Sequence, residues 1–296
     1  MQHFSEQFLR AIEQLSIDAR PPAKSGIAHG AHRGRAVGAS IDFRDYRPYT
    51  AGDDLRRVDW NVYQRSGHFF LRRFEQPTAI PVRVLIDNSP SMFVETPSRY
   101  ATAARAALAI AAAALQSGDP LTVWPFASES APPLRSVTGR GRLPDVVAYL
   151  NSLNLNPSAR LSNAVNAAAA MTNRAGLMFI ISDFFDEAGV DSLCQTLAAI
   201  QHQLVLVQVT QPTDSKPDFE GDALLVDCEN DNNVSVSATS SAVAEYLRLY
   251  NAYQQRLTSF ASERGIRFVP LSAADGQLDA ISQLFPNGIL RVGSVA

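Results

Sequence analysis

The chain has 296 residues, of which 46% are hydrophobic and 19% are charged, so it can bury a sizeable core in one large domain or two smaller ones. Its formal net charge is −3, with 26 basic and 29 acidic residues, so bulk electrostatics do not favour nucleic acid or a membrane surface as its partner. The two cysteines, Cys194 and Cys228, form neither a ligand motif nor a disulfide framework, which suits a reducing compartment.

The N-terminal segment, residues 1–20, is expected to contain an amphipathic helix over about 4–17. Its apolar positions share one helical face: Phe4, Phe8, Leu9, Ile12 and Leu15. Charges throughout the segment exclude the apolar core of a signal peptide. The longest apolar run, within 98–115, is mostly Ala and too short to span a bilayer. We therefore expect a soluble, cytoplasmic protein without direct membrane insertion.

Residues 21–80 differ in composition, with many Gly, Arg, Asp and aromatic residues, and predict a small β-rich module. Between 81 and 296, apolar strands alternate with helices, which is typical of a parallel sheet covered on both faces. Strands are expected at 81–87, 121–127, 134–139, 176–183, 202–210 and 266–272, and helices at 98–115, 142–153, 161–172, 186–200, 242–265 and just before 284. A β-hairpin is expected near 222–237, with its turn at Asn230 and Asp231.

Two of these strands end in acids, Asp87 in LIDNSPSM and Asp183 in FIISDFFD. Ligands of such sheets bind at the carboxyl ends of the strands, so both acids should lie at one edge. Ser89 and Ser91 follow Asp87 at alternate positions, which places three oxygen-bearing side chains on one side of the loop. Oxygen ligands of this kind suit Mg²⁺, which usually keeps several waters. In the alternative interpretation, these side chains only cap backbone N–H groups of a strand-to-helix loop.

The segments V-L-I-D-N-S-P-S-M and I-I-S-D-F resemble the von Willebrand factor A domain. The metal-ion-dependent adhesion site (MIDAS) of that domain uses D-x-S-x-S, a Thr on a second loop and an Asp on a third. The matching residues are Asp87, Ser89, Ser91 and Asp183. The best second-loop match, A-R-L-S-N-A-V, puts Ala159 where the Thr belongs. The resemblance implies an α/β fold of Rossmann type and a degenerate site that holds Mg²⁺ weakly, or only when a partner adds a carboxylate.

Residues 41–76 resemble the signature of a bacterial family, domain of unknown function 58. The residues that carry the resemblance are Phe43, Arg44, Tyr46, Gly52, Asp53, Asp54, Arg56, Val58, Asp59, Trp60, Arg65 and Arg73. With the von Willebrand part, the resemblance spans roughly 26–290. Many members of the family have N-terminal transmembrane helices, and this chain resembles the short soluble branch. The resemblance implies partnership with a MoxR-type AAA+ ATPase, in pairs thought to assemble or activate client proteins.

The signature has two interpretations. Its acidic, basic and aromatic residues form either a partner-binding surface or a structural network of Arg–carboxylate pairs with aromatic rings packed over them. The residues concerned are Asp53, Asp54, Arg56, Asp59, Trp60 and Arg65. Near-equal numbers of acids and arginines favour the structural network and argue against a nucleic-acid-binding stripe.

We therefore expect a non-enzymatic adaptor that binds a protein partner and a client, and no nucleic acid. One alternative is a metal-free scaffold whose loop has lost the ion, and the missing Thr supports it. The other is a metal-dependent hydrolase, for which Asp183 or Asp186 would be the general base. The H-x-x-H of His29 and His32 has no evident third ligand, and no nucleotide-binding glycine motif is present.

Overall fold

The structure is a computed structural model, and it describes residues 3–17, 42–50, 53–55, 58–75, 79–126, 132–156, 160–170, 176–186, 188–217, 221–228, 232–284 and 290–292. The chain divides into two compact units. The larger unit contains Met1–Ser25 and Ile80–Gly293, and the smaller contains Gly26–Ala79 with the last three residues. The N-terminal segment therefore belongs to the same unit as the α/β part.

The larger unit is built on a six-stranded sheet with the order β11-β8-β7-β4-β5-β6. Its strands are β4 (Val82–Ile86), β5 (Leu121–Pro125), β6 (Leu134–Val137), β7 (Leu177–Ser182), β8 (Gln203–Thr210) and β11 (Arg267–Ser272). Every pair is parallel except β5 with β6. Every residue of β4 and β7 is buried, as expected of strands covered on both faces. The predicted α/β fold with a mostly parallel sheet is confirmed.

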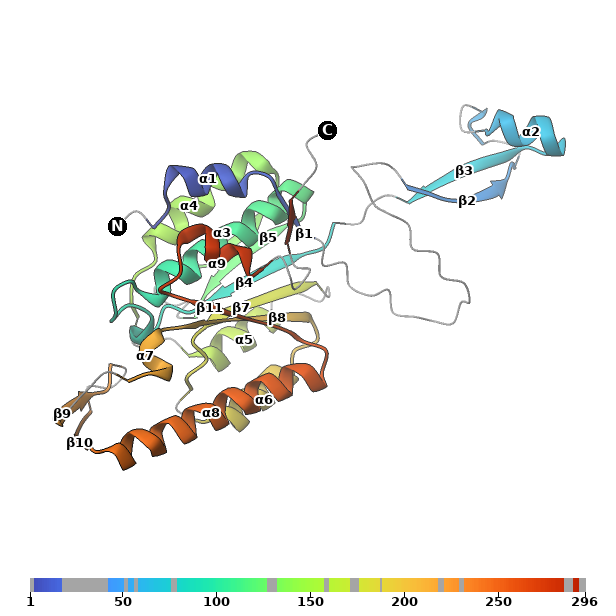
Figure 1. The fold of residues 1–296 in the computed structure, drawn as a ribbon. Helices are drawn as coiled ribbons and strands as arrows, with labels where there is room; N and C mark the ends of the chain where they lie inside the picture. Colours follow the sequence, from blue (N-terminus) through green and yellow to red (C-terminus); the bar gives the residue numbers. More distant parts are fainter. Residues whose placement is uncertain are drawn as a thin grey trace. The chain divides into compact units, whose positions relative to one another are not determined.

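Helices cover both faces of this sheet (Figure 1). One face carries α1 (Glu6–Ile12), α3 (Arg99–Ser117), α4 (Leu143–Ser152) and α9 (Gln277–Ser282), and the other α5 (Leu161–Ala170), α6 (Val190–Ala198) and α8 (Ser240–Glu263). Strand β4 serves both layers, since Val84 and Ile86 pack with α3 while Leu85 packs with the opposite layer. Helix α3 is buried nearly all round, and its many Ala side chains allow close packing.

The N-terminal helix is shorter than its periodicity predicts. Ser5 caps α1 by accepting a hydrogen bond from the Phe8 amide, and the helix ends at Ile12. Strand β1 (Leu15–Ile17) follows and pairs antiparallel with β12 (Leu290–Val292). The prediction of helix up to residue 17 is wrong because the strand partner lies at the other end of the chain, where local periodicity cannot reveal it.

Shorter elements complete the larger unit. They are the 3₁₀ turns η2 (Pro90–Met92) and η3 (Arg140–Arg142), helix α7 (Pro212–Ser215), and strands β9 (Gly221–Val226) and β10 (Asn233–Ala238). The last two pair as an antiparallel hairpin between α7 and α8.

The smaller unit consists, in its described part, of an antiparallel pair with a helix inserted between its strands. These elements are β2 (Asp42–Pro48), α2 (Trp60–Ser66) and β3 (Phe70–Glu75). Val58 and Leu71 are buried in it and form a β-bridge.

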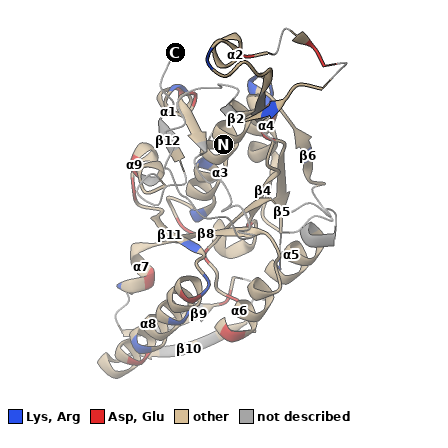
Figure 2. Ribbon diagram, turned by 90° about the vertical axis from the view of Figure 1, so that its right-hand side faces the viewer, with Lys and Arg blue, Asp and Glu red and all other residues tan. Residues whose placement is uncertain are grey.

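Acidic and basic residues are interspersed over the helices and strands (Figure 2). Within the described residues, none of the helices has both the length and the apolar character to cross a bilayer.

Candidate functional site

The two strand-end acids lie together at one edge of the sheet. Strands β4 and β7 are parallel neighbours with Ile86 opposite Ile181, and the Asp87 amide donates to the Ile181 carbonyl at 2.9 Å. Asp87 and Asp183 therefore emerge side by side, as expected from the sequence. Both are buried, and Asp183 is only 1% exposed.

The loop after β4 is closed by its own side chains. Asp87 Oδ1 accepts a hydrogen bond from the Ser89 amide at 2.9 Å, and Asp87 Oδ2 accepts one from Ser182 Oγ at 2.5 Å. The 3₁₀ turn that follows brings Ser89 Oγ to 3.0 Å from Ser91 Oγ. Asp87 thus accepts from a backbone N–H group, as expected if the loop side chains only cap the backbone. The hydroxyls of Ser89 and Ser91 lie together in the same loop, as expected if the loop binds a metal ion.

Only one of the two carboxylate oxygens of Asp183 accepts a hydrogen bond from a described residue. Its Oδ1 accepts from the Phe185 amide at 3.1 Å, but no described residue donates to its buried Oδ2. Burial, and then the charge of Asp87, raise the pKa of Asp183, and the Phe185 amide, Arg99 and Ser91 only partly oppose this. Burial also raises the pKa of Asp87, against hydrogen bonds from Ser182 and Ser89. Two neighbouring buried acids create a place where a cation is favourable.

The donor set fits a hard cation such as Mg²⁺. The orphaned Asp183 Oδ2 and the hydroxyls of Ser89 and Ser91 are oxygen donors, and Asp87 adds negative charge. No group of three or more His, Cys, Asp or Glu residues suited to a metal is found in the described part of the chain. Since Mg²⁺ takes six oxygens, waters or a partner's oxygen would have to complete the shell.

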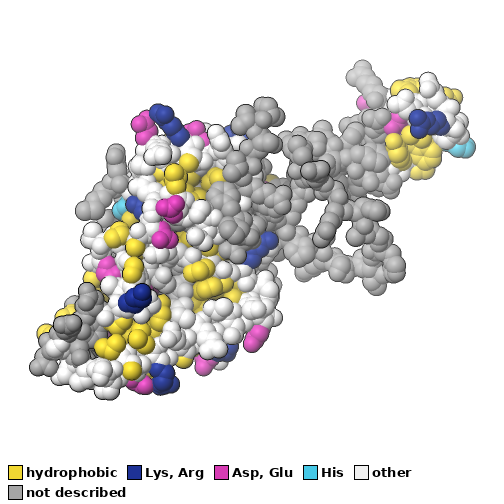
Figure 3. All heavy atoms as spheres, viewed as in Figure 1, with side chains coloured by type: hydrophobic (Ala, Val, Ile, Leu, Met, Phe, Trp, Pro, Cys, Tyr) yellow, Lys and Arg dark blue, Asp and Glu magenta, His cyan; other side chains and the backbone are white. Residues whose placement is uncertain are grey.

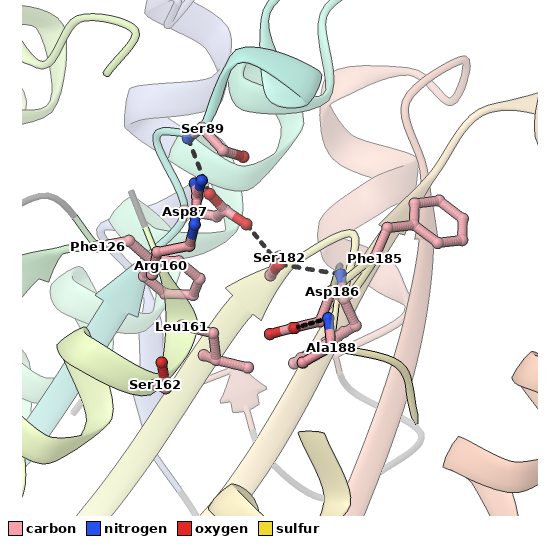
Figure 4. A pocket seen from close by; sticks show the side chains of 11 residues that line it. Asp87, Ser89, Phe126, Arg160, Leu161, Ser162, Ser182, Phe185, Asp186 and Ala188 are labelled. Atoms are coloured by element: carbon pink, nitrogen blue, oxygen red, sulfur yellow. Dashed lines mark hydrogen bonds between the residues drawn. The ribbon is translucent and has the colours of Figure 1, made fainter. Parts of the chain in front are cut away.

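A cavity of about 220 Å³ opens beside Asp87. Arg160, Leu161 and Ser162 line it from the start of α5, and the loop after β7 lines it from the other side with Phe185 and Asp186, among others (Figure 4). Ala159, at the position of the expected Thr, lies outside the described residues, and of the second loop the structure shows only Arg160 and the residues that follow it.

A buried ion pair supports the loop after β4. Arg99, the first residue of α3, donates to the Ser91 carbonyl at 3.2 Å and to Asp214 Oδ1 at 2.5 Å. Asp214 lies in α7, and its carbonyl accepts from the Tyr246 hydroxyl of α8 at 2.9 Å. The sequence analysis missed this pair. Its only sequence signal is an Arg placed at the start of an apolar helix.

In the smaller unit, two signature acids have structural partners. Arg47 donates to both oxygens of Asp53, at 2.7 and 2.5 Å, and this hydrogen bonding lowers the pKa of Asp53. Asp59 caps α2 by accepting from the Asn61 amide at 3.0 Å, and it also accepts from the Tyr46 hydroxyl at 2.9 Å.

The other signature residues are arranged differently. Trp60 is exposed and lies edge-on to Tyr63 and Phe69, so it packs on aromatic rings. Asp54 and Arg65 are exposed, and Arg56 lies outside the described residues.

Comparisons with known proteins identify relatives of this chain. The model of the family "Protein of unknown function DUF58" matches residues 45–256. Uncharacterized proteins of Mycobacterium bovis and Mycobacterium tuberculosis are 28% identical over 214 residues, 69% of this chain. The match spans 66% of the length of these relatives, just under two thirds.

Among solved structures, an aerotolerance-related membrane protein from Bacteroides fragilis, crystallised with multiple mutations to serines, is 15% identical to this chain. The TM-score is 0.36, and the match covers 70% of this chain and 98% of that one.

Proposed function

Because the chain belongs to the family of proteins of unknown function DUF58, we propose a function from its own site: it is a non-enzymatic adaptor that binds a protein partner through a Mg²⁺ ion at the sheet edge. The observation that carries the proposal is the buried Asp183 Oδ2, which lacks a donor and lies beside a second buried acid. Unpaired buried carboxylate oxygens are costly, and a cation removes the cost.

In this proposal Ser89, Ser91 and Asp183 hold the ion, and Asp87 orients the loop through Ser182 and the Ser89 amide. When bound, Mg²⁺ would supply a coordination position for a carboxylate oxygen of the partner. The chain's own residues shape the site, since Asp87 and Asp183 are both buried and the cavity opens next to Asp87.

We further propose that the fold is von Willebrand A-like and that the partner is a MoxR-type AAA+ ATPase acting with the adaptor on a client protein. The support is the resemblance of the loop after β4 and of the segment ending at Asp183 to the MIDAS pattern, together with their adjacency in space. The adaptor would work in the cytoplasm, where Cys194 and Cys228, which form no disulfide with each other, stay reduced.

A metal-free scaffold is the second candidate, and one observation favours it. Both oxygens of Asp87 already accept hydrogen bonds from within the chain, so this acid needs no cation for its satisfaction. In the scaffold, Asp183 would be neutral and the partner would bind without an ion.

Two linked measurements separate these candidates. Titration calorimetry with Mg²⁺ and Mn²⁺ should give saturable binding to the wild type and at least a tenfold loss in Asp183→Asn. Asp191→Asn, an exposed acid on α6, is the control. The tagged protein is then purified from its native lysate in Mg²⁺ or in EDTA, and we expect an AAA+ ATPase that EDTA removes. An ATPase retained equally in EDTA would refute the metal role and support the scaffold.

A further inference from the structure

The hairpin of β9 and β10 presents an apolar strand at the surface. Its two strands are antiparallel, with Leu224 of β9 opposite Ser235 and Val226 opposite Asn233. Leu224 is 60% exposed and Val226 is 57% exposed. Hydrophobic side chains are visible at the surface of the hairpin, at the lower left of Figure 3. Strand β9 therefore leaves two large apolar side chains in contact with solvent.

The backbone groups of the same two residues face away from β10. Just beyond the paired strands, the Asp227 amide donates to the Asn232 carbonyl at 2.8 Å, so these two residues form a hydrogen-bonded pair. Hydrogen-bonded and non-hydrogen-bonded pairs alternate along an antiparallel ladder. The pairs that contain Val226 and Leu224 are therefore non-hydrogen-bonded, and the N–H and C=O groups of these residues point to the outer edge of β9.

This outer edge has no third strand among the described residues, because the sheet that contains β9 consists of β9 and β10. A two-stranded hairpin is only marginally stable in water, and an open strand edge is a template for pairing with another chain. On β9 the residues with outward backbone groups, Leu224 and Val226, also have the exposed apolar side chains. An added strand would gain backbone hydrogen bonds and apolar contacts from the same residues.

The outer edge of β10 differs in its side chains. The positions opposite the outward residues of β9 are Asn233, Ser235 and Ser237, which are exposed and polar. Side chains of this kind bring little apolar surface to a cross-strand pair, and Asn is depleted in strands. The edge of β9 is therefore the one that favours an added strand.

The charge of this part of the chain indicates which kind of strand would pair with β9. Residues 217–239, which contain the hairpin, include no Lys or Arg, and their acids are Asp218, Glu220, Asp222, Asp227, Glu229 and Asp231. Of these, Asp227 is exposed at the end of β9. A second copy of the hairpin would bring a second set of acids, so like charges oppose self-pairing. A strand that carries Lys or Arg would be attracted, and the same charge would exclude acidic partners.

We propose that the outer edge of β9 is a docking site for an extended basic segment of a protein partner. The segment pairs with β9 as a third strand, places apolar side chains beside Leu224 and Val226, and carries Lys or Arg residues that the negative charge of 217–239 attracts. The site needs no metal ion and lies on other elements than Asp87 and Asp183. It therefore adds a second contact to the proposed adaptor and does not depend on the first.

The probe is a labelled peptide of alternating Val and Arg, as long as β9, added to the full chain. Its counterpart with Glu in place of Arg is the charge control. We expect saturable binding of the Arg peptide by fluorescence anisotropy, and binding of the Glu peptide weaker by about tenfold or more. In amide exchange, the N–H groups of Leu224 and Val226 should exchange quickly in the free chain and become protected by the Arg peptide, while those of Asn233 and Ser235 gain no protection.

Two proline variants distinguish the two edges of the hairpin. Leu224→Pro removes an outward N–H group of β9 and leaves the ladder with β10 intact, because Pro is tolerated where its nitrogen faces solvent. Ser235→Pro makes the same change at the directly opposite residue, on the outer edge of β10, and is the matched control. Leu224→Pro should weaken binding by about tenfold or more, through the loss of a hydrogen bond and an apolar contact, and Ser235→Pro should not change it.

Two further measurements keep this comparison sound. Slow exchange of the Leu225 amide, which faces β10, verifies that each variant keeps the hairpin. Leu224→Ser keeps the backbone N–H group and should weaken binding less than Leu224→Pro does.

Several results would overturn the docking site. These are no saturable binding of the Arg peptide, equal binding of the Arg and Glu peptides, or equal effects of the two proline variants. Sedimentation that shows self-association of the wild type, lost in Leu224→Pro, would identify a second copy as the occupant and also overturn it. Peptide binding should be unchanged in EDTA and in Asp183→Asn, and a loss in either would place the peptide at the candidate metal site instead.

Discussion

Replacement of Asp214 by Asn tests whether the buried ion pair with Arg99 holds the loop after β4 against α7. Both residues are only 7% exposed, and their charged atoms are 2.5 Å apart. Asn keeps the shape of the side chain and can still accept the Gln211 amide, which now donates to Asp214 Oδ2 at 2.8 Å. Its NH₂ group then faces the Arg99 guanidinium, so the change removes both the negative charge and the oxygen that accepts from Arg99.

The expected loss follows from what remains around the guanidinium. Breaking a buried ion pair costs about 3–5 kcal/mol because the surviving charge stays buried. Here Arg99 keeps its bond to the Ser91 carbonyl and a 3.6 Å contact with Glu95, whose side chain is 35% exposed. We therefore expect Asp214→Asn to lower the free energy of unfolding by roughly 2–4 kcal/mol.

The assay is equilibrium urea unfolding followed by the fluorescence of Trp124 in a Trp60→Phe background, so that only the larger unit reports. The control is Asp145→Asn in the exposed pair with Arg142, where the loss should be below about 1 kcal/mol. The double variant Arg99→Met with Asp214→Leu should regain much of the stability, because no buried charge is left unpaired. A loss for Asp214→Asn no larger than that of the control would refute the reasoning.

Three further predictions concern other parts of the molecule. In EDTA, Asp183→Asn should raise the free energy of unfolding by roughly 1–3 kcal/mol above pH 7, and this gain should fade as the pH falls toward 4. The reason is that the raised pKa of Asp183 in the folded protein makes its ionised form costly only at pH values above the pKa of this acid in the unfolded chain. Urea unfolding at pH 4.5 and 8 measures the gain, and an equal effect at both pH values would contradict the prediction. Asp59→Ala should lower the free energy of unfolding by about 1–2 kcal/mol, because α2 loses its cap and the hydrogen bond from the Tyr46 hydroxyl is lost. Amide exchange in β2 and β3 should become faster, and unchanged exchange would exclude this role of Asp59. Gly176→Ala should destabilise the larger unit by about 1–3 kcal/mol or more, because the Cβ of the new Ala would overlap the Pro81 carbonyl. If the variant unfolds at the same urea concentration as the wild type, the backbone at the start of the strands can move apart to make room, which would contradict the prediction.

Local pattern was sufficient for the layered α/β fold. Strands such as β4 and β7 are apolar except for Arg83 and Ser182, and each is followed by a helix, which is enough to predict a parallel sheet buried on both faces. The position of Asp87 and Asp183 at strand ends could be read in the same way, because parallel strands bring their carboxyl ends to one edge.

Long-range pairing was not visible in the sequence. Leu15 continues the helical spacing of Phe8 and Ile12, yet it lies in a strand because Leu290–Val292 offers a partner. Nor did the sequence indicate that Arg99 reaches Asp214, since 115 residues separate them and neither belongs to a recognisable motif.

The sequence by itself determined the mostly parallel sheet covered on both faces and the oxygen-bearing residues at its edge, because periodicity and strand-end chemistry are local properties. Tertiary structure alone decided which of those oxygens are satisfied: Asp87 has donors for both oxygens, while Asp183 Oδ2 has none among the described residues. It also decided that the buried residues of α8, which are Leu257, Phe260 and Ala261, all lie near the C-terminal end of the helix. These outcomes depend on packing between distant segments, which sets burial and hydrogen bonding and so decides which residues are left to bind.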